Sequence, residues 1–238
     1  MLIEVRGLSK SFGSVVVADQ IDLEVKAGEA VGIIGPNGAG KTTLFNLITG
    51  CVRPDGGNVI LNGVDITDSN VALRSRAGIG RTFQIPLPFE KLTVFENLLV
   101  SAVYGNGESE SESIERCADI LTRTGLIDFA NRPAGALTLL QRKRLELARA
   151  LATQPQLLML DEIAGGLSEA ECHELVETIR GINASGVTII WIEHIVHALL
   201  AIVSRLIVFK LGKKIAEGEP RAVMQSPEVQ EIYMGLPT

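Results

Sequence analysis

The sequence predicts an α/β protein with a mostly parallel sheet at its core, an antiparallel β-region near the N-terminus and an inserted helical subdomain. Three observations predict this architecture. Short apolar stretches alternate with helical patterns in the first and last parts of the chain, which is typical of a parallel sheet covered on two faces. One apolar stretch, 30–34, leads through a glycine-rich loop into a helix. Residues from about 85 to 150 show helical patterns, so we expect a single domain over 1–238 with this insertion.

The composition is that of a folded protein with an aliphatic core. Of 238 residues, 46% are hydrophobic and 4% aromatic, which excludes a disordered chain. The net charge of −6 excludes a global basic field for nucleic acid. Cys51, Cys117 and Cys172 lack the spacing of a zinc site or a disulfide framework, which favours a reducing compartment. We expect no export signal, and no membrane span because polar residues interrupt the apolar stretch 195–211.

Hydrophobic periodicity and turn residues place the elements along the chain. Strands are expected at 2–6, 15–17, 21–25, 30–34, 59–61, 78–82, 156–160, 187–192 and 205–210. Helices are expected at 41–49, between 61 and 78, from 93 to about 103, and at 114–124, 140–152, 169–181 and 195–202. Thr93 and Glu96 have the spacing of a capping box, which marks a helix start. The acidic, low-complexity stretch 107–113 is expected to be a solvated loop.

The glycine-rich loop has the pattern G-x-x-x-x-G-K-[ST] and is expected to bind phosphate. Its residues are Gly35, Pro36, Asn37, Gly38, Ala39, Gly40, Lys41 and Thr42, followed by Thr43. Glycines let backbone N–H groups curl around phosphate oxygens, and the following helix directs its positive end at them. Lys41 supplies a charge for the β- and γ-phosphates, and the Thr42 hydroxyl is a candidate Mg²⁺ ligand.

Polar side chains follow three of the expected strands. The apolar strand 156–160 runs into Asp161 and Glu162, of which the first suits the Mg²⁺ shell and the second can orient or deprotonate a water. His194 follows the next strand, and Gln84 follows strand 78–82, where it could contact water or metal. Carboxyl ends of parallel strands meet at one edge of a sheet. We therefore expect these side chains to converge on Lys41.

These residues, in this order, resemble the ATP-binding subunit of an ABC transporter, a P-loop NTPase cassette, over nearly the whole chain. Gly35–Thr42 is similar to the family's Walker A motif and Leu157–Glu162 to its Walker B motif. The resemblance implies ATP and Mg²⁺ as cofactors. It implies Glu162, His194 and Gln84 as the catalytic glutamate, the switch histidine and the Q-loop glutamine, and it implies metal contacts by Thr42, Gln84 and Asp161. Phe12 falls where an aromatic residue stacks on adenine, although an ordinary core Phe is the alternative.

Within the family, three stretches resemble importers of branched-chain or other hydrophobic amino acids. They are Arg81–Gln84, Leu92–Leu99 and Ser226–Gly235. The resemblance implies a peripheral protein on the cytoplasmic face of the cell membrane. Its implied partners are a second ATPase subunit, integral membrane permeases and, indirectly, an extracytoplasmic solute-binding protein, with no nucleic acid. Ile85, Leu87 and Phe89 are candidates for the permease contact, with ordinary packing as the alternative.

The family's signature, L-S-G-G-Q, is altered here. Leu137-Thr138-Leu139-Leu140-Gln141 keeps a hydroxyl at Thr138 and the glutamine at Gln141, both expected to contact nucleotide, but replaces both glycines with leucine. Glycines allow close backbone approach to the γ-phosphate of the partner's nucleotide. Ile163 and Ser168 also depart from the family pattern. We expect a heterodimer with unequal sites, although two working sites in an identical or different pair stay open.

Three other functions also stay open. Importers of amides or urea are close in sequence to the amino-acid importers. A soluble ABC ATPase outside transport would need neither a permease nor a membrane. A non-hydrolysing, nucleotide-gated subunit is compatible with the altered signature.

Overall fold

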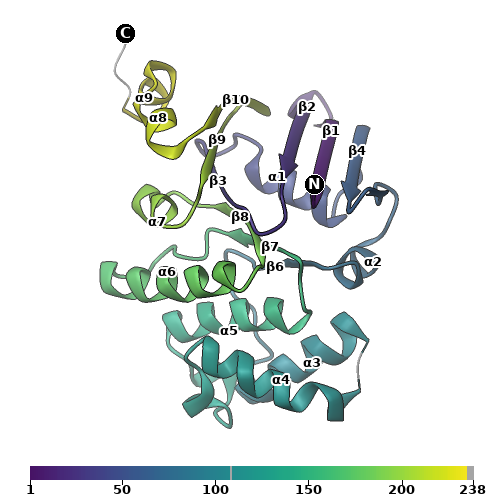
Figure 1. Cartoon of the computed structure of the whole chain (residues 1–238), viewed down its shortest axis with the longest axis vertical. Coiled ribbons are helices and arrows are strands. Elements are labelled where there is room, and N and C mark those ends of the chain that lie inside the picture. The colour runs from purple at the N-terminus through teal and green to yellow at the C-terminus, as the bar shows by residue number, and fades with distance from the viewer. Residues whose placement is uncertain (108, 235–238) are drawn as a thin grey trace.

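The computed structural model describes residues 1–107 and 109–234, and Figure 1 shows how their elements are arranged. The strands are β1 (Ile3–Phe12), β2 (Val15–Val25), β3 (Ala30–Ile34), β4 (Gly56–Leu61), β5 (Val64–Asp65), β6 (Ile79–Arg81), β7 (Leu157–Asp161), β8 (Thr188–Ile192), β9 (Arg205–Lys210) and β10 (Lys213–Gly218). The helices are α1 (Lys41–Thr49), α2 (Val71–Arg76), α3 (Val94–Asn106), α4 (Glu110–Arg123), α5 (Leu139–Ala152), α6 (Glu169–Ala184), α7 (Val196–Leu200), α8 (Pro220–Gln225) and α9 (Pro227–Met234). Two single 3₁₀ turns lie at Ile127–Phe129 and Ala134–Ala136.

The larger sheet carries the functional loops. Its order is β10-β9-β3-β8-β7-β6, and its neighbours pair in parallel except at the β9–β10 edge. Strands β3, β7 and β8 are buried at each residue, as expected for parallel strands covered on both faces. The glycine-rich loop follows β3, Gln84 follows β6, Glu162 follows β7 and His194 follows β8, so this topology gathers their loops at one edge.

The smaller sheet is antiparallel, with the order β2-β1-β4-β5, and lies at the upper right in Figure 1. Helix α1 packs between this sheet and the larger one. Its buried Leu44, Phe45, Leu47 and Ile48 share one hydrophobic cluster with side chains of both sheets. This packing fixes the direction in which the helix presents its N-terminus.

Helices α3, α4 and α5 form the lower part of the molecule in Figure 1 and pack on the opposite face of the larger sheet, together with α6 and α7. Four of these helices begin with a closed capping box. The pairs are Thr93 with Glu96 in α3, Ser109 with Glu112 in α4, Thr138 with Gln141 in α5, and Ser168 with Glu171 in α6. Each box satisfies backbone N–H groups at a helix start and thereby fixes where the helix begins.

The predicted fold class is confirmed, with corrections at particular elements. The expected loop at 107–113 is wrong for 110–113, which form the first turn of α4; residue 108 lies outside the described residues. Ser113 is buried there, and its hydroxyl donates to the Ser109 carbonyl. The two strands expected at 15–17 and 21–25 are one continuous strand, β2. Strand β10 and helices α8 and α9 were not predicted.

In the ranges 1–107 and 109–234, no helix combines the length and the apolar character that crossing a bilayer requires.

Candidate functional site

The glycine-rich loop is held in a shape that glycine permits at two positions. Gly35 and Gly40 have φ angles of 154° and 99°. A Cβ at Gly35 would lie 2.3 Å from the Phe209 carbonyl oxygen, and one at Gly40 would lie 2.3 Å from the Val17 carbonyl oxygen. Side chains would therefore push the loop away from both sheets. The two glycines fix the loop against the scaffold and hold the start of α1 in place.

Lys41 lies at the first position of α1 and is buried. Its Nζ donates to the carbonyl oxygens of Gly35 at 2.7 Å and of Pro36 at 3.0 Å, so the loop itself holds the ammonium. Burial lowers the pKa of Lys41, and the nearby carboxylates of Glu162 and Asp161 oppose that shift. The result is a buried cation held by two backbone carbonyls beside the loop, where an anionic ligand is favoured.

A cavity of about 440 Å³ opens over this loop, within the roughly 300–1,000 Å³ range of ligand pockets. It is lined by Val17, Asn37, Gly38, Ala39, Gly40, Lys41, Thr42, Thr43, Gln84 and Glu162. The loop therefore shares a single cavity with the predicted Gln84 and Glu162. Helix α1 has no side-chain cap at its N-terminus. Its first N–H groups are the ones that a phosphate would satisfy.

Glu162 joins two of the predicted residues. Its Oε2 accepts from Gln84 Nε2 at 2.5 Å, and its Oε1 lies 2.7 Å from His194 Nε2, which donates in the tautomer protonated at that nitrogen. The Glu162 side chain is mostly buried, while that of His194 is partly exposed. Glu162 also has a φ of 47°, in the left-handed region that costs a non-glycine residue energy. This backbone conformation at Glu162 places its side chain in the wall of the cavity.

Asp161 is held by Arg81 of the neighbouring strand β6. Arg81 Nη2 donates to Asp161 Oδ2 at 2.8 Å, and both side chains are buried. The Arg81 guanidinium also donates to Asn46 Oδ1 and lies over the rings of Phe45 and Phe83, at 5.5 and 5.0 Å. Burial raises the pKa of Asp161, and the hydrogen bond from Arg81 opposes that shift. Sequence patterning alone missed this role of Arg81.

The donor set at this edge fits Mg²⁺. Among the described residues, no group of three or more His, Cys, Asp or Glu side chains is arranged to hold a metal. Mg²⁺ is commonly bound by one or two protein oxygens together with waters and substrate phosphates. The Asp161 carboxylate and the Thr42 hydroxyl are hard oxygen donors of that kind, and Thr42 lines the cavity.

Seven of the predicted residues do not line this cavity: Phe12, Gly35, Pro36, Thr138, Gln141, Asp161 and His194. Gly35 and Pro36 border it through their contacts with Lys41, and His194 through its contact with Glu162. Asp161 directly precedes Glu162 in the chain and contacts Arg81. Phe12 is half exposed at the end of β1, with Lys10 Nζ 5.5 Å from its ring centroid, so it is not an ordinary core residue. Thr138 caps α5, and its N–H donates to Gln141 Oε1 at 3.0 Å, so the two residues form a closed capping box. Neither Thr138 nor Gln141 lines the cavity over the chain's own loop.

Two buried charged residues near the site escaped the sequence analysis. Glu193 accepts from the N–H groups of Ala164 at 2.7 Å and His194 at 3.0 Å, and thereby ties the turns after β7 and β8 together. Burial raises the pKa of Glu193, and these N–H donors oppose the shift. Lys143 of α5 donates to the Gln84 carbonyl at 2.6 Å. No local pattern marks either residue, because burial of a charge depends on tertiary packing.

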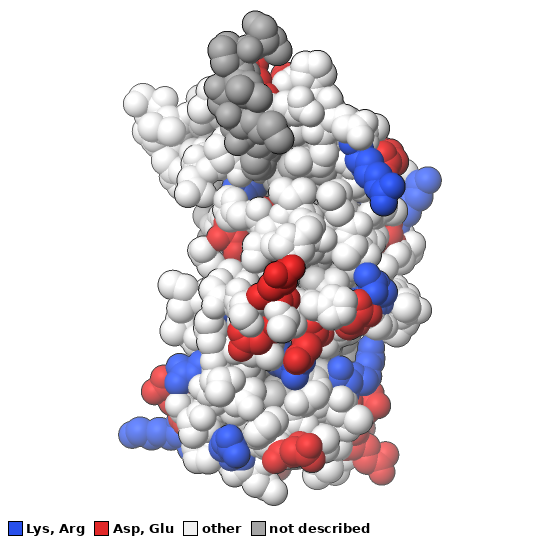
Figure 2. Space-filling model, turned by 90° about the vertical axis from the view of Figure 1, so that its left-hand side faces the viewer, with Lys and Arg blue, Asp and Glu red and all other residues white. Residues whose placement is uncertain are grey.

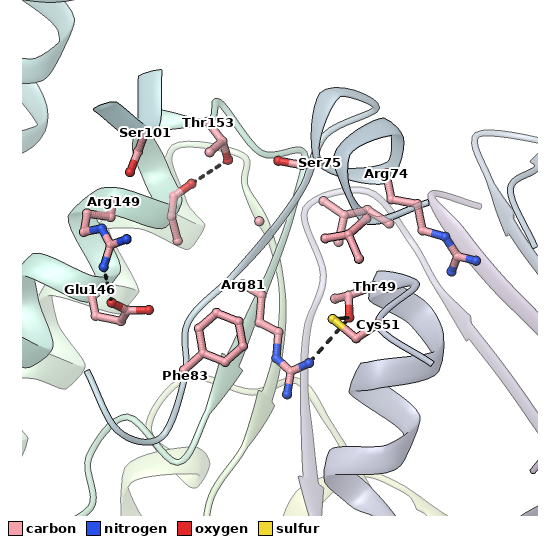
Figure 3. Close-up of a pocket in the computed structure, with 14 residues that line it drawn as sticks. Thr49, Cys51, Arg74, Ser75, Arg81, Phe83, Ser101, Glu146, Arg149 and Thr153 are labelled. Carbon is pink, nitrogen blue, oxygen red and sulfur yellow. Dashed lines mark hydrogen bonds and ion pairs between the residues drawn. The ribbon is translucent and has the colours of Figure 1, made fainter. Parts of the chain in front are cut away.

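A second cavity lies between α5, α2 and the Gln84 loop (Figure 3). Figure 3 shows Phe83 and Arg81 on one side of it, and Glu146 and Arg149 of α5 on the other. Phe83 lines this cavity and is 51% exposed. Ile85 and Leu87, which follow Gln84 in the chain and do not line the cavity, are 69% and 76% exposed. We call this second cavity the groove. Phe83 lines the groove and the next residue, Gln84, lines the first cavity, so the two cavities are adjacent along the chain.

Comparison with known proteins identifies the family. The ABC transporter family model matches residues 18–165. The chain is 37% identical to the high-affinity branched-chain amino acid transport ATP-binding protein LivG of Escherichia coli K12, over 98% of both chains. It is 36% identical to BraF of Pseudomonas aeruginosa, again over 98% of both chains.

Solved structures agree in fold. A nucleotide-free ATP-binding cassette from an ABC transporter matches with a TM-score of 0.91 and 34% identity over 99% of both chains. The ADP conformation of an ATP-binding cassette matches with a TM-score of 0.90, again at 34% identity over 99% of both chains. The resemblance seen in the sequence is confirmed: the chain belongs to the ABC transporter family and is an ATP-binding cassette.

Proposed function

We propose that this chain is the ATP-binding and ATP-hydrolysing subunit of an importer for branched-chain or other hydrophobic amino acids. The observation that carries the hydrolytic role is the cavity in which Lys41, Gln84 and Glu162 meet, with Glu162 bonded to both Gln84 and His194. The amino-acid substrate rests on the names of LivG and BraF. We propose that 1–238 is one nucleotide-binding domain, with about 85–150 as its helical subdomain.

In this proposal each residue has a defined role, and Gln84 and His194 have two. The loop N–H groups and Lys41 bind the triphosphate, and Phe12 stacks on the base. Glu162 orients the attacking water and accepts its proton, since its carboxylate lies at the cavity wall. Gln84 and His194 hold the two carboxylate oxygens, and His194 also responds to the γ-phosphate. Thr42, Asp161 and Gln84 would hold Mg²⁺, which supplies charge neutralisation on the phosphates when bound.

We propose that the signature of this chain serves the cavity of a second ATPase subunit. Thr138 and Gln141 lie at a helix start and away from the chain's own loop. The Leu139 side chain is 45% exposed there, where the family's glycine leaves the backbone open. A second, different subunit with an intact signature would complete the cavity over Lys41. The cavity that receives Leu139 would then be slow, giving unequal sites.

We propose that the groove in Figure 3 receives a segment of an integral membrane permease. The exposed Ile85 and Leu87 favour an apolar segment. Arg81, which lines the groove, also bonds Asp161, so an occupant would contact a residue that holds the metal-binding carboxylate. The protein would then be peripheral on the cytoplasmic face of the membrane, with the solute-binding protein reached through the permease.

Figure 2 shows Lys and Arg scattered over one face and not gathered into a basic patch, which gives no support for a nucleic-acid partner on that face.

The experiment is ATP hydrolysis by the purified, assembled complex with Glu162→Gln in this chain. We expect turnover to fall by about 10²- to 10⁴-fold, the usual contribution of a general base, while Mg-ATP still binds. The matched control is Glu177→Gln, an exposed glutamate paired with Arg180 on α6, which should leave turnover unchanged. Near wild-type turnover of Glu162→Gln would exclude hydrolysis at this cavity.

The same purification separates the alternatives. An apolar membrane partner supports the transport role, whereas nucleic acid in its place would indicate a soluble ABC ATPase. Uptake assays with labelled leucine, urea and a short amide then distinguish the substrate classes.

A further inference from the structure

Helix α5, which begins at the signature, also forms hydrogen bonds with the loop that carries Gln84. Three of its side chains reach this loop, and they are spaced by three residues so that they lie along one side of the helix. Lys143 Nζ donates to the Gln84 carbonyl at 2.6 Å. The Glu146 carboxylate accepts from the Phe83 N–H, and Arg149 Nη1 donates to the Leu87 carbonyl at 3.1 Å. We call Lys143, Glu146 and Arg149 the α5 clamp.

Lys143 is the member of the α5 clamp that reaches the hydrolytic residues. Its side chain is buried, and desolvation lowers its pKa, an effect opposed by Glu193, Glu146 and Glu162. Besides the Gln84 carbonyl, its Nζ lies 3.5 Å from the Glu162 carbonyl oxygen. The Gln84 side chain in turn donates to the Glu162 carboxylate at 2.5 Å. Lys143, Gln84 and Glu162 therefore form a closed ring of contacts.

Two members of this ring, Gln84 and Glu162, lie in backbone segments that no helix or strand holds in place. Gln84 lies in an irregular loop beyond the end of β6 and is exposed to solvent. Glu162 lies just past β7 with a φ of 47°, a conformation that needs support from its surroundings. An ammonium that bonds the first carbonyl and lies near the second supplies support to both. Burial strengthens these interactions because competing water is excluded.

We propose that Lys143 is a positioning residue for ATP hydrolysis: from the signature helix it holds Gln84 in reach of Glu162 without touching the nucleotide. This inference rests on the hydrolytic role proposed for Glu162. It gives α5 two roles: its start belongs to the surface proposed to meet a second subunit, and Lys143, one turn later, holds this chain's own Gln84. A displacement of α5 would then move Gln84 relative to Glu162.

The test compares Lys143→Met, which keeps the length and removes the donor, with Lys143→Arg, which restores donors to the carbonyls. Hydrolysis is measured in the assembled complex. We expect Lys143→Met to lower kcat by about ten- to hundredfold, since misplacement by a remote change can cost about a hundredfold. The KM for ATP and the Mg-ATP affinity should stay within about twofold, because Lys143 makes no contact in the loop cavity. Lys143→Arg should recover most of kcat.

Arg144→Met is the matched control, because Arg144 is the next residue on α5 and pairs with the exposed Glu174 of α6 and not with the Gln84 loop; its kcat should not change. If Lys143→Met does not fold, Lys143→Gln carries the test, since its shorter amide does not span to both carbonyls. Wild-type kcat in whichever of these variants folds overturns the proposal. So does a joint loss of kcat, nucleotide affinity and thermal stability, which would mark a merely structural role.

Glu162→Gln measured in parallel separates the two ideas. If Glu162→Gln retains hydrolysis, the role proposed for Glu162 fails. A selective loss of kcat in Lys143→Met would then indicate that Lys143 positions Gln84 for another group.

Discussion

Helix α1 begins at the end of the glycine-rich loop and helix α5 begins within the signature, yet the backbone N–H groups at the two helix starts are satisfied in opposite ways. Helix α1 begins after Gly40 with no side-chain cap, so its first backbone N–H groups are left to an external partner. Helix α5 begins after Thr138 with a closed capping box, in which Thr138 and Gln141 satisfy each other's N–H groups. The α1 start is built for an anion, whereas the α5 start is already satisfied by its own residues.

The difference separates the cavity over this chain's own loop from the surface that we propose it contributes to a second subunit. The α1 start is backed by the buried Lys41 and faces Glu162 across one cavity. The α5 start exposes Leu139, whose Cδ2 lies close to Gly166 in the turn after β7. In free-energy terms, we expect nucleotide binding to depend strongly on the first start and weakly on the second.

The largest effect should come from the open start. Lys41→Met removes the ammonium that the loop holds beside the phosphate position. Hydrogen bonds to charged groups contribute about 1.5–3 kcal/mol each, so we expect Mg-ATP affinity to weaken by about a hundredfold or more. Calorimetric titration of the purified chain measures this. Lys26→Met, in the exposed turn between β2 and β3, is the control and should bind as the wild type does. Equal affinity in both variants would contradict the assignment of this loop.

The open start could be predicted from the sequence residue by residue, since glycine spacing and a following helix are local features. The convergence of Gln84, Glu162 and His194 was also predictable, because parallel strands end at one edge of a sheet. The contacts of Lys143, Glu193 and Arg81 were not, since each depends on burial produced by segments far apart in the chain.

The stretch 107–113 shows where local patterning misled. Its acidic composition indicated a loop, yet Ser109 and Glu112 have the same capping-box spacing that was recognised at Thr93 and Glu96. Glu110 and Glu112 lie in the first turn of α4, where negative charge is favourable near the positive helix end. A start signal of specific spacing was therefore more informative than mean charge.

A smaller effect is expected at the closed start. Thr138→Ala opens the capping box of α5, and loss of such a cap costs about 1 kcal/mol of the free energy of unfolding. Urea denaturation of the purified chain measures this. Thr122→Ala is the control, because its hydroxyl bonds a carbonyl one turn back on the exposed side of α4; it should change stability by less than about 0.5 kcal/mol. Similar losses in both variants would show that the cap has no special role.

The smallest effect concerns Leu139 and tests whether the closed start limits the second cavity. Leu139 is exposed, while Leu140 packs partly against the core, so Leu139→Gly removes the obstructing side chain and leaves the packing of Leu140 in place. The glycine costs up to about 1 kcal/mol of helix stability. If one of two cavities is slow, a restored approach of backbone donors to the γ-phosphate should raise hydrolysis by the assembled complex by up to about twofold. Leu139→Ala should give a smaller rise because it keeps a Cβ. No rise in either variant would mean that the leucine is tolerated and that the difference between the two helix starts does not make the sites unequal.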